Sequence, residues 1–411
     1  MKRFFSFILC ALSSSVLMAQ TYTLDHYLEI AKNNSPLLKD LRNQVASNQV
    51  DSLRLLAGYK PQVNINSTGL YAPTINGYGY SEAITNAHTL NALMGVNQAI
   101  VSKKNLGAQV EALNLLSQSV KNAAKISEQD LKKAITTQYI TAFGSLQQVK
   151  FNREIVSLLS KGEDMLKRLT RSNVYRQSDY LIFLVTLKQQ QLQLSQSILQ
   201  YKNDYATLNY LVGVADTSTV ELQEPDIHIT MLPGISNSIF FKQYKLDSLK
   251  LVNSRQLVDF SYKPKINIGA DGGYNSDFMG QAYKNFGLSA GFNLTIPIYD
   301  GGQRKMQYRK ISLEEETRRN YEAFFNVQYR QQIVQINQQI TESNILLNQV
   351  EDQIKYSETL IKVDTQLLQT GDLRIADLLL AVNNYFTIKN LKTTTTINKL
   401  QLINQLNYWN K

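Results

Sequence analysis

Residues 286–298 read FGLSAGFNLTIPI, in which apolar side chains alternate with small or polar ones. The apolar set is Phe286, Leu288, Ala290, Phe292, Leu294, Ile296 and Ile298. Because successive side chains of a strand point to opposite faces, the pattern predicts a strand with one apolar and one polar face. The stretch is also long enough to cross a bilayer as a tilted strand, which takes about 9 to 11 residues.

Three further segments alternate: residues 90–100 in the same way, and residues 63–68 and 266–271 less cleanly. Together the segments predict two β-hairpins, at about 60–101 and about 263–299. Alternation alone also fits strands of a soluble protein, so that alternative stays open.

The sequence repeats itself over a long distance, which indicates a duplication. Residues 59–65 read YKPQVNI, and residues 262–268, 203 positions later, read YKPKINI. Leu208-Asn209-Tyr210 recurs 198 positions later at residues 406–408. The shorter second spacing places a longer hairpin loop in the first copy.

We therefore predict two tandem copies, residues 20–213 and 237–411, joined by a connector at residues 214–236. Each copy is predicted to contain a helix, a β-hairpin and a long helical hairpin. The helical hairpins are expected at about 104–212 and about 303–409.

A seven-residue spacing of apolar side chains predicts the long helices. In the second copy the positions are Ile333, Ile340, Leu347, Ile354, Ile361 and Leu368, with Ile336, Ser343, Val350 and Ser357 between them. The corresponding residues of the first copy are Ile135, Ala142, Val149 and Val156. Such a seam is typical of coiled coils, in which helices pack along one apolar stripe.

The first residues have the pattern of a secretory signal. A basic start at Lys2 and Arg3 precedes the apolar stretch Phe4–Leu12, and small residues follow up to Ala19. We expect residues 1–19 to be removed as a signal peptide. No later segment has the run of about 18 apolar residues that a membrane-spanning helix requires.

Composition makes most enzyme classes poor candidates. The single cysteine, Cys10, lies in the leader, and His26, His88 and His228 are scattered without ligand spacing. No Ser/His/Asp set is clustered, which disfavours an exported hydrolase, and no cofactor or metal is expected. The net charge of +10 is spread along the chain and does not indicate nucleic-acid binding.

Four membrane-type strands cannot close a barrel alone, because the smallest spanning barrels have about eight strands and open edges are excluded from lipid. Several chains would therefore contribute strands to one wall. Eight strands from two chains would be filled by side chains, whereas twelve strands from three chains would begin to leave a lumen. Polar faces rich in Gly, Ser, Asn and Thr favour a wet interior.

The chain resembles the TolC family of outer-membrane efflux and secretion ducts over essentially its whole mature length. The matching stretches are residues 22–36 (YTLDHYLEIAKNNSP), 296–302 (IPIYDGG), 371–379 (GDLRIADLL) and 406–408 (LNY). They are similar, in that order, to the opening helix, a strand-to-helix junction, the second helical hairpin tip and the closing helix of the family.

The resemblance implies an α+β membrane protein and a homotrimer. Its 12-stranded β-barrel, with four strands per chain, would contact outer-membrane lipid and continue into a long α-helical coiled-coil barrel in the periplasm. It also implies a passive duct of a tripartite efflux or type I secretion system, which docks to a periplasmic adaptor and an inner-membrane pump. The alternatives are a periplasmic coiled-coil adaptor and a structural protein of the envelope.

The candidate gate residues are Asp377, Asp179 and Arg374. Asp377 matches the family position whose carboxylates ring the closed entrance, and Asp179 lies 198 residues before it. Three symmetry copies of a carboxylate would favour cations at a constriction. The alternative for each aspartate is a capping or first-turn residue of a helix. Arg374 lies one position past the usual arginine of the family and is a candidate latch to a neighbouring helix.

The turns of the two helical hairpins are the candidate adaptor-docking tips. Their residues are Asn173, Val174, Tyr175, Gly371, Asp372 and Leu373. Gly371 keeps the tip glycine of the family, whereas Asn173 replaces it in the first copy; asparagine tolerates the left-handed conformation next best to glycine. Elsewhere, Glu314–Glu316 with Arg318 and Arg319 predicts a solvated helix face with i to i+4 ion pairs.

Overall fold

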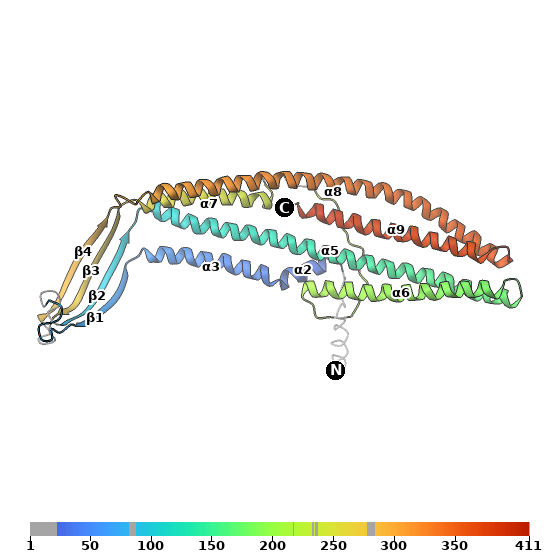
Figure 1. Cartoon of the computed structure of the whole chain (residues 1–411), viewed down its shortest axis with the longest axis horizontal. Coiled ribbons are helices and arrows are strands. Elements are labelled where there is room, and N and C mark those ends of the chain that lie inside the picture. Colours follow the sequence, from blue (N-terminus) through green and yellow to red (C-terminus); the bar gives the residue numbers. More distant parts are fainter. Residues whose placement is uncertain are drawn as a thin grey trace, which may run out of the picture. The chain divides into compact units, whose positions relative to one another are not determined.

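The computed structural model describes residues 23–81, 88–216, 218–231, 234, 237–277 and 284–410, so the expected signal peptide at residues 1–19 lies outside the described part. Helices and strands follow one another in the order shown in Figure 1. The elements are α2 (Leu24–Asn34), α3 (Pro36–Gly58), β1 (Gln62–Tyr71), β2 (His88–Ile100), α5 (Lys103–Arg171), α6 (Gln177–Val212), α7 (Ile239–Ser261), β3 (Lys265–Ser276), β4 (Phe286–Thr295), α8 (Gln303–Thr370) and α9 (Ile375–Tyr408). The order of one helix, two strands, a long helix and a shorter helix thus occurs twice, after α2.

The chain folds into two compact units, each built from both halves of the sequence. The described residues of the first lie within 1–38, 126–238 and 326–411, and those of the second lie within 39–125 and 239–325. Helices α5 and α8 contribute residues to both units.

The second unit contains one antiparallel sheet in the order β1-β2-β3-β4. Its register pairs Ile65 with Met94, and Val96 with Ala270. Ile268 pairs with Phe292. Since paired residues point to the same side, the apolar residues of all four strands share one face, as the alternation predicts. Strands β1 and β4 are the edges of the sheet within one chain.

The turn from β4 into α8 explains the sequence IPIYDGG. The Asp300 carboxylate accepts hydrogen bonds from the backbone N–H groups of Gly302 at 2.9 Å and Arg304 at 2.7 Å. These bonds hold the pKa of Asp300 below its ordinary value. Gly301 and Gly302 have φ angles of 65° and 84°, which side-chain-bearing residues rarely adopt. The motif therefore starts a long helix by capping its first N–H groups.

The helices of the second unit are joined by buried asparagines. Asn122 of α5 donates to the Ile239 carbonyl of α7 at 2.9 Å, and Asn253 of α7 donates to the Ala108 carbonyl of α5 at 3.0 Å. Each bond gives a buried side-chain amide N–H group a partner on the neighbouring helix, which stabilises the packing of α5 against α7.

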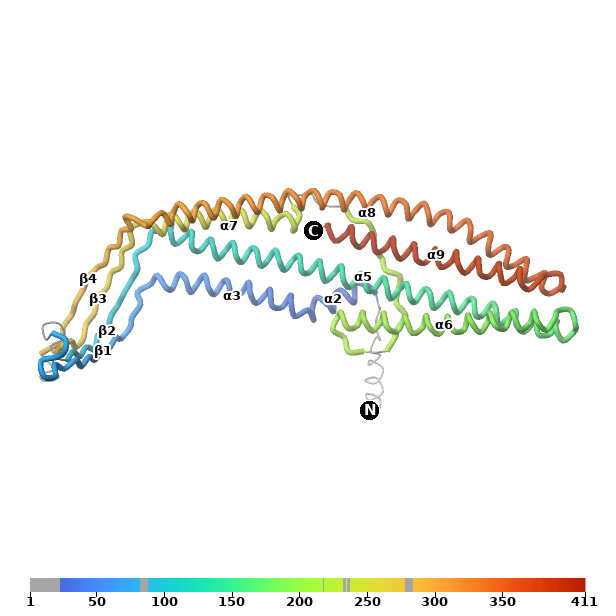
Figure 2. Tube along the Cα trace, viewed as in Figure 1, coloured from blue at the N-terminus to red at the C-terminus, as the bar shows by residue number. Residues whose placement is uncertain are grey.

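The first unit consists of two helical hairpins, α5 with α6 and α8 with α9, together with α2 (Figure 2). The predicted seam is confirmed: its residues on α8 are buried or half-buried, and Ile135, Ala142 and Val149 of α5 are buried. The core around Ile135 also contains Tyr27 of α2 and Tyr205 of α6, whose hydroxyl groups lie 3.0 Å apart. None of the helices in the described residues combines the length and the apolar character that crossing a membrane requires.

Candidate functional site

The tip of the first helical hairpin is a tight turn after α5. Asn173 has a φ angle of 59°, in the left-handed region. The backbone N–H of Val174 donates to the Leu169 carbonyl at 3.0 Å, and that of Asn173 to the Thr170 carbonyl at 3.1 Å. These two bonds form a Schellman motif, which ends a helix by satisfying its last carbonyl groups.

The tip of the second hairpin has the same geometry. Gly371 has a φ angle of 82°. The Asp372 N–H donates to the Leu367 carbonyl at 3.1 Å, and the Gly371 N–H to the Leu368 carbonyl at 3.4 Å. The left-handed residue is therefore Asn173 in one tip and Gly371 in the other, which are the two residue types that tolerate this conformation best.

The two tips contact each other within one chain. The Tyr175 hydroxyl donates to the Leu373 carbonyl at 2.8 Å. A Cβ atom added to Gly371 would lie 2.6 Å from a methyl group of Val174, so the tips approach too closely for a larger residue. Burial raises the pKa of Tyr175, and its hydrogen bond to Leu373 acts in the opposite direction.

An apolar core lies behind this contact and joins the two hairpins. It includes Leu166 of α5, Phe183 of α6, Leu368 of α8 and Ile375 of α9. Leu373 belongs to the same core and is only 8% exposed, so its side chain supports the tip and does not offer a docking surface. Among the other docking candidates, Asn173, Val174 and Asp372 are exposed, while Tyr175 and Gly371 are half-buried.

The predicted gate residues lie in the first turns of α6 and α9. The guanidinium of Arg374, the N-cap residue of α9, binds both carboxylate oxygens of Asp377 in the first turn of that helix, at 2.9 and 3.1 Å. Asp179 accepts a hydrogen bond of 3.3 Å from the Arg176 backbone N–H, which is the bond of a capping residue. Both aspartates are half-buried and sit where the positive end of a helix dipole favours a carboxylate.

A third carboxylate, which is not among the residues predicted from the sequence, lies near the second tip. Asp364 occupies a seam position of α8 and is 7% exposed. Burial, and then the negative charge of Asp377, raise the pKa of Asp364. The sequence does contain a sign of this residue. Asp364 lies three residues after Ile361 and four before Leu368, and this heptad spacing places a charged residue on an apolar seam.

The sheet has an apolar face that no other described segment of the chain covers. Its exposed residues include Val63, Ile65, Met94, Ile268, Leu288, Phe292 and Leu294. Phe292, for example, is 76% exposed. Contiguous apolar surface of this kind marks contact with a membrane or another protein.

The opposite face of the sheet is polar. An open hollow of about 440 Å³ lies against it, lined among others by Asn66, Asn97, Asp271, Ser289 and Asn293. Of the tyrosines near the strand ends, Tyr71, Tyr78, Tyr80 and Tyr299 are exposed, whereas Tyr274 is buried and its ring packs 5.9 Å from that of Phe286.

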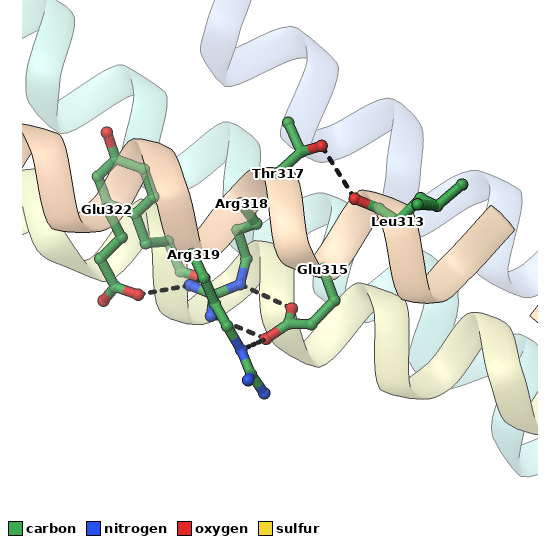
Figure 3. Close-up of polar contacts among 7 residues, drawn as sticks. Leu313, Glu315, Thr317, Arg318, Arg319 and Glu322 are labelled. Carbon is green, nitrogen blue, oxygen red and sulfur yellow. Dashed lines mark hydrogen bonds and ion pairs between the residues drawn. The ribbon is translucent and has the colours of Figure 1, made fainter. Parts of the chain in front are cut away.

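The charged group at Glu315 is more enclosed than the predicted solvated face (Figure 3). Arg318 is only 13% exposed and binds Glu315 at 2.8 Å and Glu322 at 2.7 Å. It also donates to the Tyr244 carbonyl of α7 at 3.4 Å, while Arg319 makes the predicted i to i+4 pair with Glu315. These hydrogen bonds, that of Arg318 above all, lower the pKa of Glu315 to about 2. The cluster therefore joins α8 to α7 and is part of the helix packing.

No group of three or more His, Cys, Asp or Glu side chains in the described residues is arranged to hold a metal ion.

Comparison with known proteins identifies relatives by structure only. No family profile matches the sequence, and no curated protein matches it. Among solved structures, the outer membrane protein VceC from Vibrio cholerae matches with a TM-score of 0.77 and 13% identity, over 94% of this chain and 95% of VceC. The MtrE outer membrane channel of Neisseria gonorrhoeae, in its open state, matches with a TM-score of 0.77 and 11% identity, over 94% of this chain and 88% of MtrE.

The CmeC outer membrane channel of Campylobacter jejuni matches with a TM-score of 0.74 and 11% identity, over 94% of this chain and 85% of CmeC. These matches extend over the sheet and the helical hairpins together. The chain therefore has the fold of the outer-membrane channels, and the resemblance of its sequence to the TolC family is confirmed at the level of the fold.

Proposed function

We propose that the protein is the outer-membrane exit duct of a tripartite efflux or type I secretion system. It acts as a homotrimer, with a periplasmic adaptor and an inner-membrane pump as its partners. The observation that carries the proposal is the sheet: four strands with two open edges, one exposed apolar face and one polar face.

A sheet of this kind is stable in a membrane only after its edges are paired. Unpaired backbone groups cost several kcal/mol each in hydrocarbon, by a rough estimate. In three copies, β4 of one chain pairs with β1 of the next, and four strands per chain give a closed barrel of twelve. Lipid then covers the apolar face, and the polar face lines a wet lumen.

The helical hairpins form the periplasmic part of the duct. Each chain contributes α5, α6, α8 and α9, and packing between chains continues the seams found within one chain. The hairpin tips close the entrance, where three Asp377 carboxylates ring the axis, and Asp179 and Arg374 lie in the same layer. Opening separates the tips, which breaks the hydrogen bond from Tyr175 to Leu373 and the contact of Val174 with Gly371.

The exposed tip residues are the proposed adaptor surface. Asn173, Val174 and Asp372 present side chains there, and Gly371 presents backbone. Tyr175 and Leu373 support this surface through their hydrogen bond and their packing against the apolar core. A partner with a complementary hairpin tip would insert between these turns.

Conductance of the purified protein in planar bilayers tests the proposal. We expect channels, and we expect Asp377→Asn to weaken block by trivalent cations added on the side of the hairpin tips. Asp179→Asn tests the second candidate gate carboxylate in the same way; this carboxylate caps its own helix, so we expect a smaller change in the block. Protein that is folded but never conducts contradicts the proposed duct.

The rival function of a periplasmic adaptor makes a different prediction. An adaptor needs no lipid-facing sheet, so it would leave the cells with the soluble periplasmic fraction. The exposed apolar face of the sheet favours the duct, for which the protein stays in the outer-membrane fraction after washing with high salt.

A further inference from the structure

We propose that Asp271 is a cation-attracting site inside the barrel, separate from the carboxylates of the hairpin tips. The inference rests on the proposed trimeric duct and adds a determinant of its selectivity. In the trimer, three Asp271 carboxylates ring the lumen part-way along the strands, and small hydrated cations are the ligands.

The register of the sheet places Asp271 on the polar face. It pairs with Gly95 of β2 and with Ser289 of β4, which both belong to the polar set. The Ser289 hydroxyl donates to one carboxylate oxygen at 2.8 Å. Within the described residues this is the carboxylate's single side-chain partner, and no Lys, Arg or His of that part of the chain forms an ion pair with it.

The neighbours of Asp271 leave it open to the lumen. The residues two positions before and after it on the same face are Gly269 and Gly273, and Gly287 and Gly291 flank Ser289 in the same way. No long side chain from these positions covers the carboxylate. The hollow on the polar face is lined by Asp271 together with Gly95, Gly269 and Gly291.

The charge of Asp271 is not balanced within the strands. Apart from Asp271, the four strands contain only Lys265 and His88 as basic or acidic residues. Lys265 shares the parity of Asp271, but it lies six residues away at the helical end of β3, which is roughly 20 Å at about 3.3 Å per residue. On β2, Gly95 shares the polar face with Asp271, and His88 lies seven residues before Gly95. His88 therefore belongs to the apolar face.

A ring of uncompensated carboxylates inside a low-dielectric wall attracts cations and repels anions. The effect should depend on salt, because the Debye length is about 10 Å at 0.1 M and about 3 Å at 1 M. At low salt the fields of the three carboxylates overlap across the lumen, and at high salt each is screened.

Reversal potentials under a KCl gradient test the inference, in planar bilayers holding the full-length protein. We expect Asp271→Asn to lower the ratio of K⁺ to Cl⁻ permeability about twofold or more near 0.1 M salt. Near 1 M salt, where each carboxylate is screened, the permeability ratio of the variant should equal that of wild type. Asp271→Glu keeps the charge and should keep the wild-type ratio. Ser289→Ala removes the hydrogen bond but not the charge, and it should behave as Asp271→Glu does.

The same direction of change is expected in an Asp377→Asn background, because Asp271 and Asp377 have different side-chain partners, and substitutions at sites without shared partners are usually additive. An unchanged permeability ratio in Asp271→Asn, or an equal loss in Ser289→Ala, overturns the inference and leaves the duct intact. Absence of conductance from wild type as well contradicts the duct itself.

Discussion

At Glu315, two arginines hold one carboxylate, which makes this residue a sensitive test of the helix packing. The pKa of Glu315, about 2, lies below its ordinary value because Arg318 donates to the carboxylate. A group with a lowered pKa stabilises the fold above its ordinary pKa of about 4.3, and the stabilisation is lost as the pH falls toward 2. Glu315→Gln should therefore lower the free energy of unfolding by about 1 to 2 kcal/mol at pH 7.

The difference between wild type and Glu315→Gln should shrink between about pH 4 and pH 2, where the wild-type carboxylate becomes protonated. Thermal unfolding at a series of pH values measures it. Glu314→Gln is the matched control, because the one ion pair of Glu314 with the described residues is an exposed pair with Lys310 at 3.8 Å. Equal effects of the two substitutions would show that the cluster does not join α7 to α8.

At Gly371, backbone conformation and close contact act together. Gly371→Ala should cost about 1 to 2 kcal/mol, because alanine is strained at positive φ. Its methyl group would also meet Val174. Asn173→Gly should be neutral or slightly stabilising, since glycine suits the same conformation. Unfolding temperatures of the two variants check this prediction, and a neutral Gly371→Ala would contradict the tip geometry.

Some of these features of individual residues could be predicted from the sequence, and others could not. The left-handed residues of the tips followed from glycine and asparagine in equivalent turns. The burial of Leu373 could not be predicted. It lies in a turn, where side chains follow no helix or strand period that would indicate which of them face a core. The enclosure of Arg318 was missed for a related reason: it depends on a carbonyl of α7, more than 70 residues away in the sequence.

At the scale of elements, the seam of α8 carries the packing of the second hairpin. Ile340→Ala should cost about 2 to 5 kcal/mol, because a buried side chain is removed and leaves a cavity. Val334→Ala on the same helix is the control: Val334 is 67% exposed, and its loss should change the stability by no more than about 0.5 kcal/mol. Chemical unfolding in detergent compares them, and equal costs would mean that the seam is wrongly placed.

The elements themselves were the most predictable part of the protein. Period two predicted the strands and period seven predicted the long helices, because each period records which side chains meet a common surface. Neither period could predict that β2 pairs with β3, because a period describes one segment and this pairing joins two segments more than 160 residues apart. The break between α2 and α3 coincides with Pro36, which suits the first turn of a new helix and interrupts the previous one.

At the scale of the whole molecule, the two faces of the sheet must meet different surroundings. Phe292→Arg places a charge on the proposed lipid face and should cost about 2 to 4 kcal/mol near the middle of a membrane. Asn293→Arg places the same charge on the polar face and should be tolerated. The yield of heat-resistant, membrane-assembled protein measures both, and equal assembly of the two variants would contradict the assignment of the faces.

In the proposed trimer, one chain supplies a third of a closed pore. Native mass spectrometry of the full-length protein, extracted from outer membranes in a mild detergent, tests it most directly. We expect a single species of three chains, because the twelve strands of the proposed barrel would leave no unpaired edge in lipid. A stable species of one or two chains would contradict it.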